Sequence, residues 1–181
     1  MRISISLVQD GGFGPFPAGK QYDFEVTADM LSPYAVVEYQ ATDDDTLTFG
    51  LRYEMLEYDY DNLMIDGNTA EDGTPCGGGC RYSRPSDRSD DFDNYTAQIG
   101  WIHDFDQSTQ FFSNVSYAFR APQATELYRL QANQTVTDLD SEEISSIEAG
   151  YRVGRDNVSY SLVAYYMEKD NVIFQDSDRN E

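Results

Sequence analysis

The sequence predicts an all-β fold of antiparallel strands in up-and-down order, with about seven or eight strands from the wall of a larger transmembrane β-barrel. Apolar and polar residues alternate along several runs of the 181-residue chain, which is typical of strands with one apolar and one polar face. Short turns alternate with long loops, as a barrel with two different rims requires. We therefore expect long extracellular loops at one rim and short periplasmic turns at the other.

The N-terminal part of the chain contains a series of short alternating runs. Gly and Pro residues interrupt the pattern over residues 9–20, and Pro33 interrupts it again. The connection at residues 30–33 is short where the alternation of loop lengths requires a long one. Residues 22–28 therefore either span the membrane or lie within a larger outer loop. The predicted strands are residues 3–7, 22–28, 35–40 and 46–55, with a tight turn at residues 43–45.

The rest of the chain alternates long loops with paired strands. Residues 59–91 have no sustained alternation and are predicted as a long outer loop, a kind of segment that is usually functional. The strand over residues 110–120 ends before Pro122, which has no N–H to donate, and a second long loop covers residues 123–141. Further strands are predicted at residues 95–101, 146–153 and 158–166, with short turns at residues 103–107 and 154–157.

The alternation assigns side chains to the two faces of the wall, because successive residues of a strand point to opposite sides. The residues expected to face lipid are Leu47, Phe49, Leu51, Phe111, Val115, Tyr117, Ile147, Ala149, Leu162 and Ala164. Those expected to face the lumen are Thr48, Arg52, Asn114, Ser116, Glu148 and Ser161.

Composition excludes one class of partner and is compatible with a membrane wall. The chain has 33 acidic and 12 basic residues, a net charge of −21, so phosphates would repel it and nucleic acid is not an expected partner. Aromatic residues make up 14%, and tyrosine suits the membrane interface. No apolar run is long enough for a transmembrane helix.

An ordered set of short motifs resembles the barrel of TonB-dependent outer-membrane receptors, over the region from Tyr34 to the end of the chain. Proteins of that family commonly end one strand with a similar Arg-containing motif and open the next with a similar acidic run. The matching residues are Phe119-Arg120-Ala121-Pro122, Glu126-Leu127-Tyr128, then Leu139, Glu142, Glu148, Gly150 and Tyr151, together with Gly50-Leu51-Arg52-Tyr53 and Tyr58-Asp59-Tyr60-Asp61-Asn62.

The resemblance implies active uptake of a scarce solute, typically a ferric siderophore or another metal chelate. It implies a location in the outer membrane of a Gram-negative bacterium, in contact with the lipid bilayer and lipopolysaccharide, and energy delivered by TonB through a plug domain. It implies no enzymatic activity, cofactor or metal centre in this segment. No signal sequence, plug-like stretch or terminal aromatic strand is recognised, so residues 1–181 are expected to be a fragment of the barrel domain.

Cys76 and Cys80 flank three glycines within the first long loop. A disulfide would pin the tip of this loop in an oxidising compartment, and the glycines supply the flexibility that a small ring needs. The spacing does not match a structural zinc site. The alternative is a pair of free thiols.

The candidate ligand-binding residues lie in or beside the long loops. Arginine binds carboxylate and phosphate groups with a planar fork, which suits an anionic chelate. For Arg81, Arg84 and Arg88 the alternative is charge balance with nearby aspartates. These are Asp87, Asp90, Asp91 and Asp93. Arg120 lies on the polar row, where a salt bridge with a lumen carboxylate such as Glu148 is expected. The candidate set is Tyr60, Arg81, Arg84, Arg88, Arg120 and Tyr128.

The remaining polar clusters carry no recognisable chemistry. The acidic runs at residues 43–45 and 87–93 lack the spacing of an EF-hand calcium loop and suit solvated turns. His103 is the single histidine and has no partners for a catalytic set.

Two other interpretations remain open from the sequence. One is a passive porin-like or adhesin-like barrel, which a plug domain in the complete gene would exclude. The other is a soluble acidic β-domain, a glycan-binding or hydrolytic module, which would be monodisperse and melt cooperatively without detergent.

Overall fold

A computed structural model describes residues 1–13, 16–132, 134, 138–155 and 157–173 of the chain. Its regular secondary structure consists almost entirely of strands, and its helix α1 has five residues. No helix within these residues is long and apolar enough to cross a membrane. The elements are β1 (Arg2–Gln9), β2 (Gly19–Leu31), β3 (Tyr34–Gln40), β4 (Asp45–Asn62), β5 (Tyr82–Ser83), β6 (Arg88–Asp106), β7 (Thr109–Arg120), α1 (Ala124–Tyr128), β8 (Leu130–Gln131), β9 (Glu142–Arg155) and β10 (Val158–Asp170).

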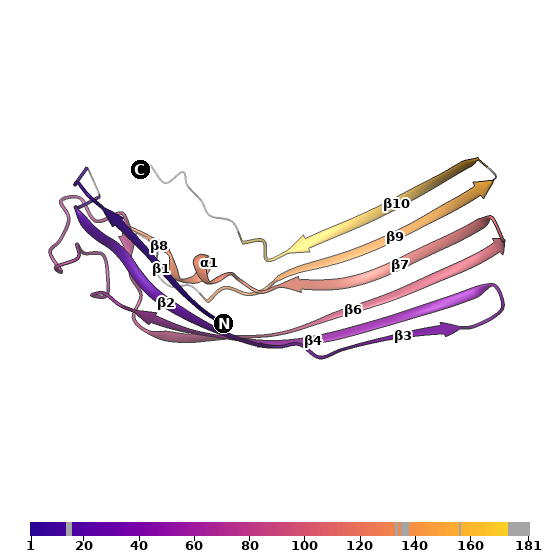
Figure 1. The fold of residues 1–181 in the computed structure, drawn as a ribbon, viewed down its shortest axis with the longest axis horizontal. Helices are drawn as coiled ribbons and strands as arrows, with labels where there is room; N and C mark the ends of the chain where they lie inside the picture. The colour runs from indigo at the N-terminus through magenta and orange to yellow at the C-terminus, as the bar shows by residue number, and fades with distance from the viewer. Residues whose placement is uncertain (14–15, 133, 135–137, 156, 174–181) are drawn as a thin grey trace.

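The long strands form one curved antiparallel sheet (Figure 1). Its order is β1-β2-β4-β6-β7-β9-β10, with β3 paired to β4, and every pairing is antiparallel. Apart from β2 and β3, which both pair with β4, strands that follow one another in this sheet lie side by side, which is up-and-down topology. Within the described residues the sheet does not close on itself. The predicted fold class, part of an antiparallel barrel, is confirmed.

β2 and β3 form one interrupted line along the same edge of β4. Leu31 at the end of β2 pairs with Met55, and Tyr34 at the start of β3 pairs with Arg52. The Pro33 carbonyl bridges the break by accepting a hydrogen bond of 3.0 Å from the Tyr53 N–H. Because proline has no N–H, the ladder is interrupted there without a change of direction. Residues 22–28 thus continue the line of β3 toward the long loops, and the alternation of loop lengths is restored.

β4 and β6 extend further than the sequence analysis predicted. They contain 18 and 19 residues, whereas a tilted membrane strand needs about ten. The predicted loop over residues 59–91 is therefore wrong in its bounds, since the strands continue to Asn62 and resume at Arg88. The predicted turn at residues 103–107 is also wrong, because β6 continues to Asp106 and the turn is residues 107–108.

The register confirms which side chains share a face. Cross-strand partners point to the same side, and Phe49, Ile99, Val115 and Ile147 form one row across four strands. Thr48, Gly100, Asn114 and Glu148 form the adjacent row on the other face. All ten residues assigned to lipid lie on the first face, called the outward face below. All six assigned to the lumen lie on the second, the inward face.

The buried core lies on the inward face, at the end of the sheet where the long loops are. Phe24 and Val26 of β2 and Tyr60 of β4 pack there against Leu127 and Tyr128 of α1. Tyr60 and Tyr128 stack with their ring centroids 4.5 Å apart. The second long loop therefore folds back over the sheet and covers apolar side chains that would otherwise face water.

Candidate ligand-binding rim

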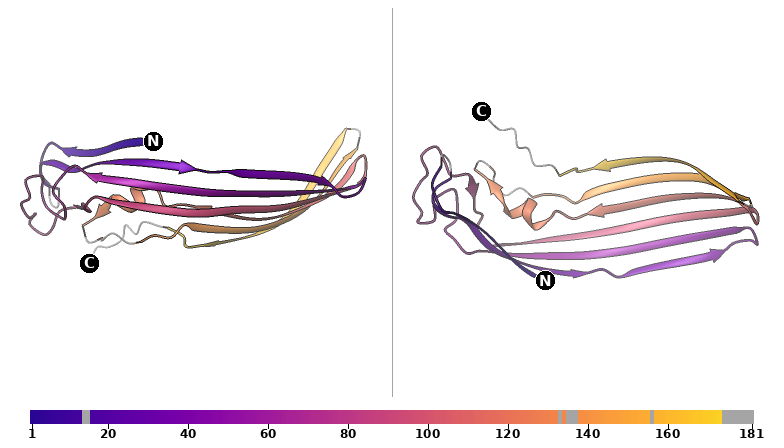
Figure 2. Two further views of the ribbon diagram at one scale, coloured as in Figure 1. Left: turned by 90° about the horizontal axis from the view of Figure 1, so that it is seen from below. Right: turned by 45° about the horizontal axis from the view of Figure 1, so that its top comes forward.

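The long-loop rim consists of the described parts of the connections at residues 10–18, 63–87 and 121–141, which gather at one end of the sheet (Figure 2). The second and third connections are tied together by a short antiparallel pairing between β5 and β8, in which Tyr82 is opposite Gln131. This pairing joins two loops that are about fifty residues apart in the sequence into one surface.

The loop at residues 63–87 has an internal framework. Cys76 and Cys80 form a disulfide, and Gly78 and Gly79 adopt positive φ angles of 93° and 90° between them, a conformation that favours glycine. Asn68 closes the base of this ring. Its amide accepts a hydrogen bond of 2.7 Å from the Cys80 N–H and donates to the Cys80 and Tyr82 carbonyls, each at 2.7 Å.

Arg84 is a central connector of this rim and is only 3% exposed. Its Nε donates to the Ile65 carbonyl at 2.6 Å, its Nη1 to the Gln21 carbonyl at 3.1 Å and its Nη2 to Thr69 Oγ1 at 2.7 Å. The expected alternative, charge balance with the nearby aspartates, does not describe Arg84, because its bonds go to backbone carbonyls and a hydroxyl.

The two candidate tyrosines are buried. Tyr60 is 2% exposed and Tyr128 is 1% exposed, so both pack within the core and neither offers a surface to a ligand in this chain. The Tyr128 hydroxyl donates to Asp90 Oδ2 at 2.7 Å, and burial together with this carboxylate raises the pKa of Tyr128 above its ordinary value. The hydrogen bond fixes α1 to β6.

Arg120 lies on the inward face at the end of β7 and is 35% exposed. Its Nε donates to Glu142 Oε2 at 2.6 Å, and its Nη1 donates to Glu126 Oε2 at 3.0 Å. The expected partner Glu148 is wrong, because the register puts Glu148 opposite Asn114 while Arg120 is opposite Glu142. The expectation of a salt bridge on the polar row holds, with a different carboxylate.

Glu142 is the centre of this ion-pair network and is 2% exposed. Besides Arg120 it accepts bonds from Lys169 Nζ at 2.9 Å and from the Ile173 N–H at 2.7 Å. These donors, Arg120 first, lower the pKa of the Glu142 carboxyl to about 2. Glu126 also accepts a hydrogen bond of 2.7 Å from the Gln123 N–H, which forms a capping box at the start of α1.

Arg88 and Arg81 are the remaining candidates. Arg88 pairs with Asp90 and lies 3.5 Å from Asp138 Oδ1, so it balances aspartates as the alternative interpretation expected. Arg81 is exposed, and its guanidinium carbon lies 5.1 Å from the centroid of the Phe16 ring.

Sequence reasoning missed several residues that organise the rim. Asn68 was not recognised as the residue that closes the disulfide ring. The ion-pair network was not recognised either; it consists of Arg120, Glu126, Glu142 and Lys169. Glu126, three residues after Gln123, matches the Glu position of a capping box, but Gln123 does not match the usual Ser or Thr, so the sequence holds only a partial signal for the helix. Asn68 has no comparable signal, because its partners belong to a loop whose shape the sequence does not reveal.

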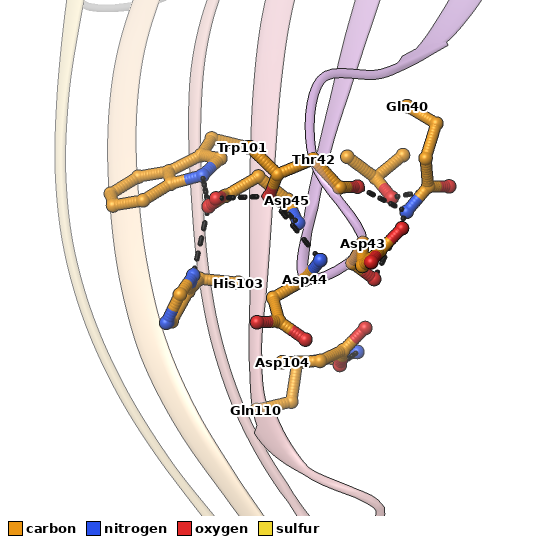
Figure 3. Close-up of polar contacts among 10 residues, drawn as sticks. Gln40, Thr42, Asp43, Asp44, Asp45, Trp101, His103, Asp104 and Gln110 are labelled. Carbon is orange, nitrogen blue, oxygen red and sulfur yellow. Dashed lines mark hydrogen bonds and ion pairs between the residues drawn. The ribbon is translucent and has the colours of Figure 1, made fainter.

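The opposite, short-turn rim carries a separate polar cluster around Asp45 (Figure 3). Asp45 accepts hydrogen bonds from Thr42 Oγ1 at 2.7 Å and Trp101 Nε1 at 2.9 Å, and its Oδ1 lies 2.8 Å from His103 Nδ1. These contacts fix the turn between β3 and β4 to β6. Among the described residues no group of three or more His, Cys, Asp or Glu side chains is arranged to hold a metal ion.

These features define a class of protein: a segment of transmembrane β-barrel wall, with an apolar outward face, a polar inward face and a rim of long, ordered loops. The family model described as TonB dependent receptor-like, beta-barrel, matches residues 6–181. The chain therefore belongs to the TonB-dependent receptor family. A search of curated proteins found no match. The family's barrel domain belongs to receptors and transporters of the Gram-negative outer membrane.

Proposed function

We propose that residues 1–181 form part of the wall and outer loops of a receptor that takes up a scarce solute, most specifically a ferric siderophore or another metal chelate. The observation that carries this proposal is the family match over residues 6–181. We infer that its role is transport and not catalysis, and that it needs no cofactor. TonB supplies energy through a plug domain, which these residues do not include.

The rim supports an anionic solute. Arg81 is exposed on the long-loop rim, and the side chains of Arg88 and Arg120 remain partly accessible beside their carboxylate partners. A guanidinium binds carboxylate or catecholate oxygens through its planar fork. In this proposal Arg81 makes the first contact, and the buried Arg84, Tyr60 and Tyr128 hold the loops that present it.

The wall supports residence in a bilayer. The outward rows are apolar, and the paired backbone groups of a closed ladder are what a strand needs within lipid. The lipid bilayer and lipopolysaccharide are therefore the proposed surroundings of the outward face.

Uptake by cells tests the proposal. A strain in which the complete protein is the sole receptor should accumulate radiolabelled iron from at least one member of a panel of ferric siderophores, and loss of TonB should abolish this uptake. TonB-independent uptake would instead indicate a passive barrel, and absence of uptake for every chelate would remove the siderophore assignment.

A charge reversal localises the contact. Arg81→Glu should lower uptake of an anionic chelate, because it replaces the exposed rim cation with an anion. Arg155→Glu is the matched control, since Arg155 is exposed at the end of β9 on the short-turn rim. Equal uptake by both variants would remove Arg81 from the binding surface.

A further inference from the structure

A groove of about 670 Å³ runs along the long-loop end of β6. One bank consists of seven consecutive residues, from Arg88 to Asn94. A groove over the face of a strand is lined by every second residue, so consecutive lining means that it follows the strand's edge. The other bank and the floor are formed by Leu127, Asp138, Leu139, Asp140, Ser141, Glu143 and Asn171.

This edge of β6 has no strand partner among the described residues. β6 pairs with β4 as far as Arg88, but its pairing with β7 stops where Ala97 is opposite Tyr117 (Figure 1). β7 turns away toward α1, and β6 continues alone on that side. Every second residue of such an edge directs its N–H and C=O outward, which is a template for adding another strand.

The two sides of the groove differ in chemistry. Asp91 and Asp93 share the outward face, as does Glu143 on the opposite bank. Toward the inward face, Phe92, Leu127 and Leu139 belong to or pack against the apolar core. The whole lining has one guanidinium, Arg88, and six carboxylates: Asp90, Asp91, Asp93, Asp138, Asp140 and Glu143.

Asn94 supplies an independent observation. Its side-chain Nδ2 is buried and has no hydrogen-bond partner within the described residues, although it lines the groove. A buried donor without an acceptor costs free energy, about 1–3 kcal/mol. A carbonyl oxygen that entered the groove beside Asn94 would satisfy this donor.

We propose that this groove docks an extended cationic peptide segment, which adds to the edge of β6 as a strand. Its Lys or Arg side chains face Asp91, Asp93 and Glu143, and its intervening apolar side chains face Phe92, Leu127 and Leu139. The open backbone edge selects a peptide over a free cation, because only a chain with its own N–H and C=O groups continues the ladder. This docking is separate from the proposed solute uptake.

A designed peptide tests the proposal directly. A fluorescent decapeptide of alternating Lys and Val should bind the complete protein in detergent micelles, with affinity that falls as salt rises. The same peptide with backbone N-methyl groups along one edge keeps its charge but cannot join the ladder, and it should bind at least about tenfold more weakly. Equal binding of the two peptides, or equally effective competition by spermidine, would overturn strand addition.

Variants locate the site. The double variant Asp91→Asn/Asp93→Asn should weaken binding of the Lys-Val peptide at least about tenfold. Asp29→Asn/Asp61→Asn is the matched control, because these exposed aspartates lie on the outward face of β2 and β4, on the side of β6 away from the groove. Its affinity should stay within about twofold of the unmodified protein. Equal losses in both variants would assign binding to the general negative charge and overturn the proposal.

Discussion

Single residues hold the long-loop rim in place. Arg120 joins the end of β7 to the start of β9 through Glu142 and to α1 through Glu126. Lys169 brings β10 to the same carboxylate. One buried carboxylate therefore connects three elements, and a buried charge of this kind depends on its partners.

Acid should weaken this network. The folded pKa of Glu142 is lowered to about 2, so its contribution to stability is present above the ordinary glutamate pKa and is lost as pH falls toward the folded value. We expect Glu142→Gln to lower the melting temperature of the complete protein at pH 7, and the difference from the unmodified protein to shrink between about pH 4.5 and 2. A difference that stays constant over this range would show that the charge of Glu142 is not stabilising.

Arg84 offers a second test at the residue scale. Arg84→Ala leaves the Ile65 and Gln21 carbonyls without this donor. The folded conformation of the loop should be destabilised by about 1–3 kcal/mol as a result. Hydrogen exchange across residues 63–87 should become faster in this variant. Arg81→Ala, which removes an exposed guanidinium from the same loop, should leave the exchange unchanged.

At the scale of elements, β4 has two regions of opposite polarity. From Leu47 to Tyr53 its apolar side chains face outward, whereas Tyr58 and Tyr60 face inward and the acidic Asp59 and Asp61 face outward. The strand therefore leaves the lipid zone without ending. The inward face beyond that zone is apolar because α1 covers it.

A lysine scan of one face of β4 should reveal this boundary. Leu51→Lys places a charge in the lipid-facing row and should cost about 2–4 kcal/mol near the bilayer midplane. Asp59→Lys also introduces a lysine on the outward face but beyond the apolar rows, and it should cost much less. Unfolding of both variants in lipid vesicles measures the difference, and equal costs would contradict the assigned boundary.

The same inversion explains what the sequence could and could not predict. Alternation in the lipid zone identified the strands, their faces and the topology, because a single rule applies throughout that zone. The rule failed at Tyr58 and Tyr60, where the covering partner is a helix distant in sequence, so the first long loop was predicted too long. Arg120 was correctly assigned to the polar row, but its partner depends on a register that alternation alone does not determine.

At the scale of the whole molecule, the sheet is a wall with unpaired edges. Within the described residues it ends at β1 and β3 on one side and at β10 on the other. Open edges with exposed apolar side chains favour association, and they are not tolerated in lipid. The long-loop rim, by contrast, is packed through β5–β8, the disulfide and Arg84, so it behaves as an ordered surface.

Residues 1–181 expressed alone should therefore not form a monodisperse domain in buffer. We expect aggregation, which light scattering would detect, because the edges lack partner strands. A soluble monomer with a cooperative melting transition would contradict the barrel-wall interpretation and favour a soluble β-domain.

Contact between the outward rows and lipid is the defining property of a barrel wall. Nitroxide labels on the complete protein in bilayers test it at neighbouring positions: Leu51 and Arg52 on β4, Gln98 and Ile99 on β6, and Ile147 and Glu148 on β9. Labels at Leu51, Ile99 and Ile147 should collide preferentially with oxygen, which partitions into lipid, and labels at Arg52, Gln98 and Glu148 with a water-soluble nickel complex. The reversed pattern, or equal accessibility within each pair, would contradict the account.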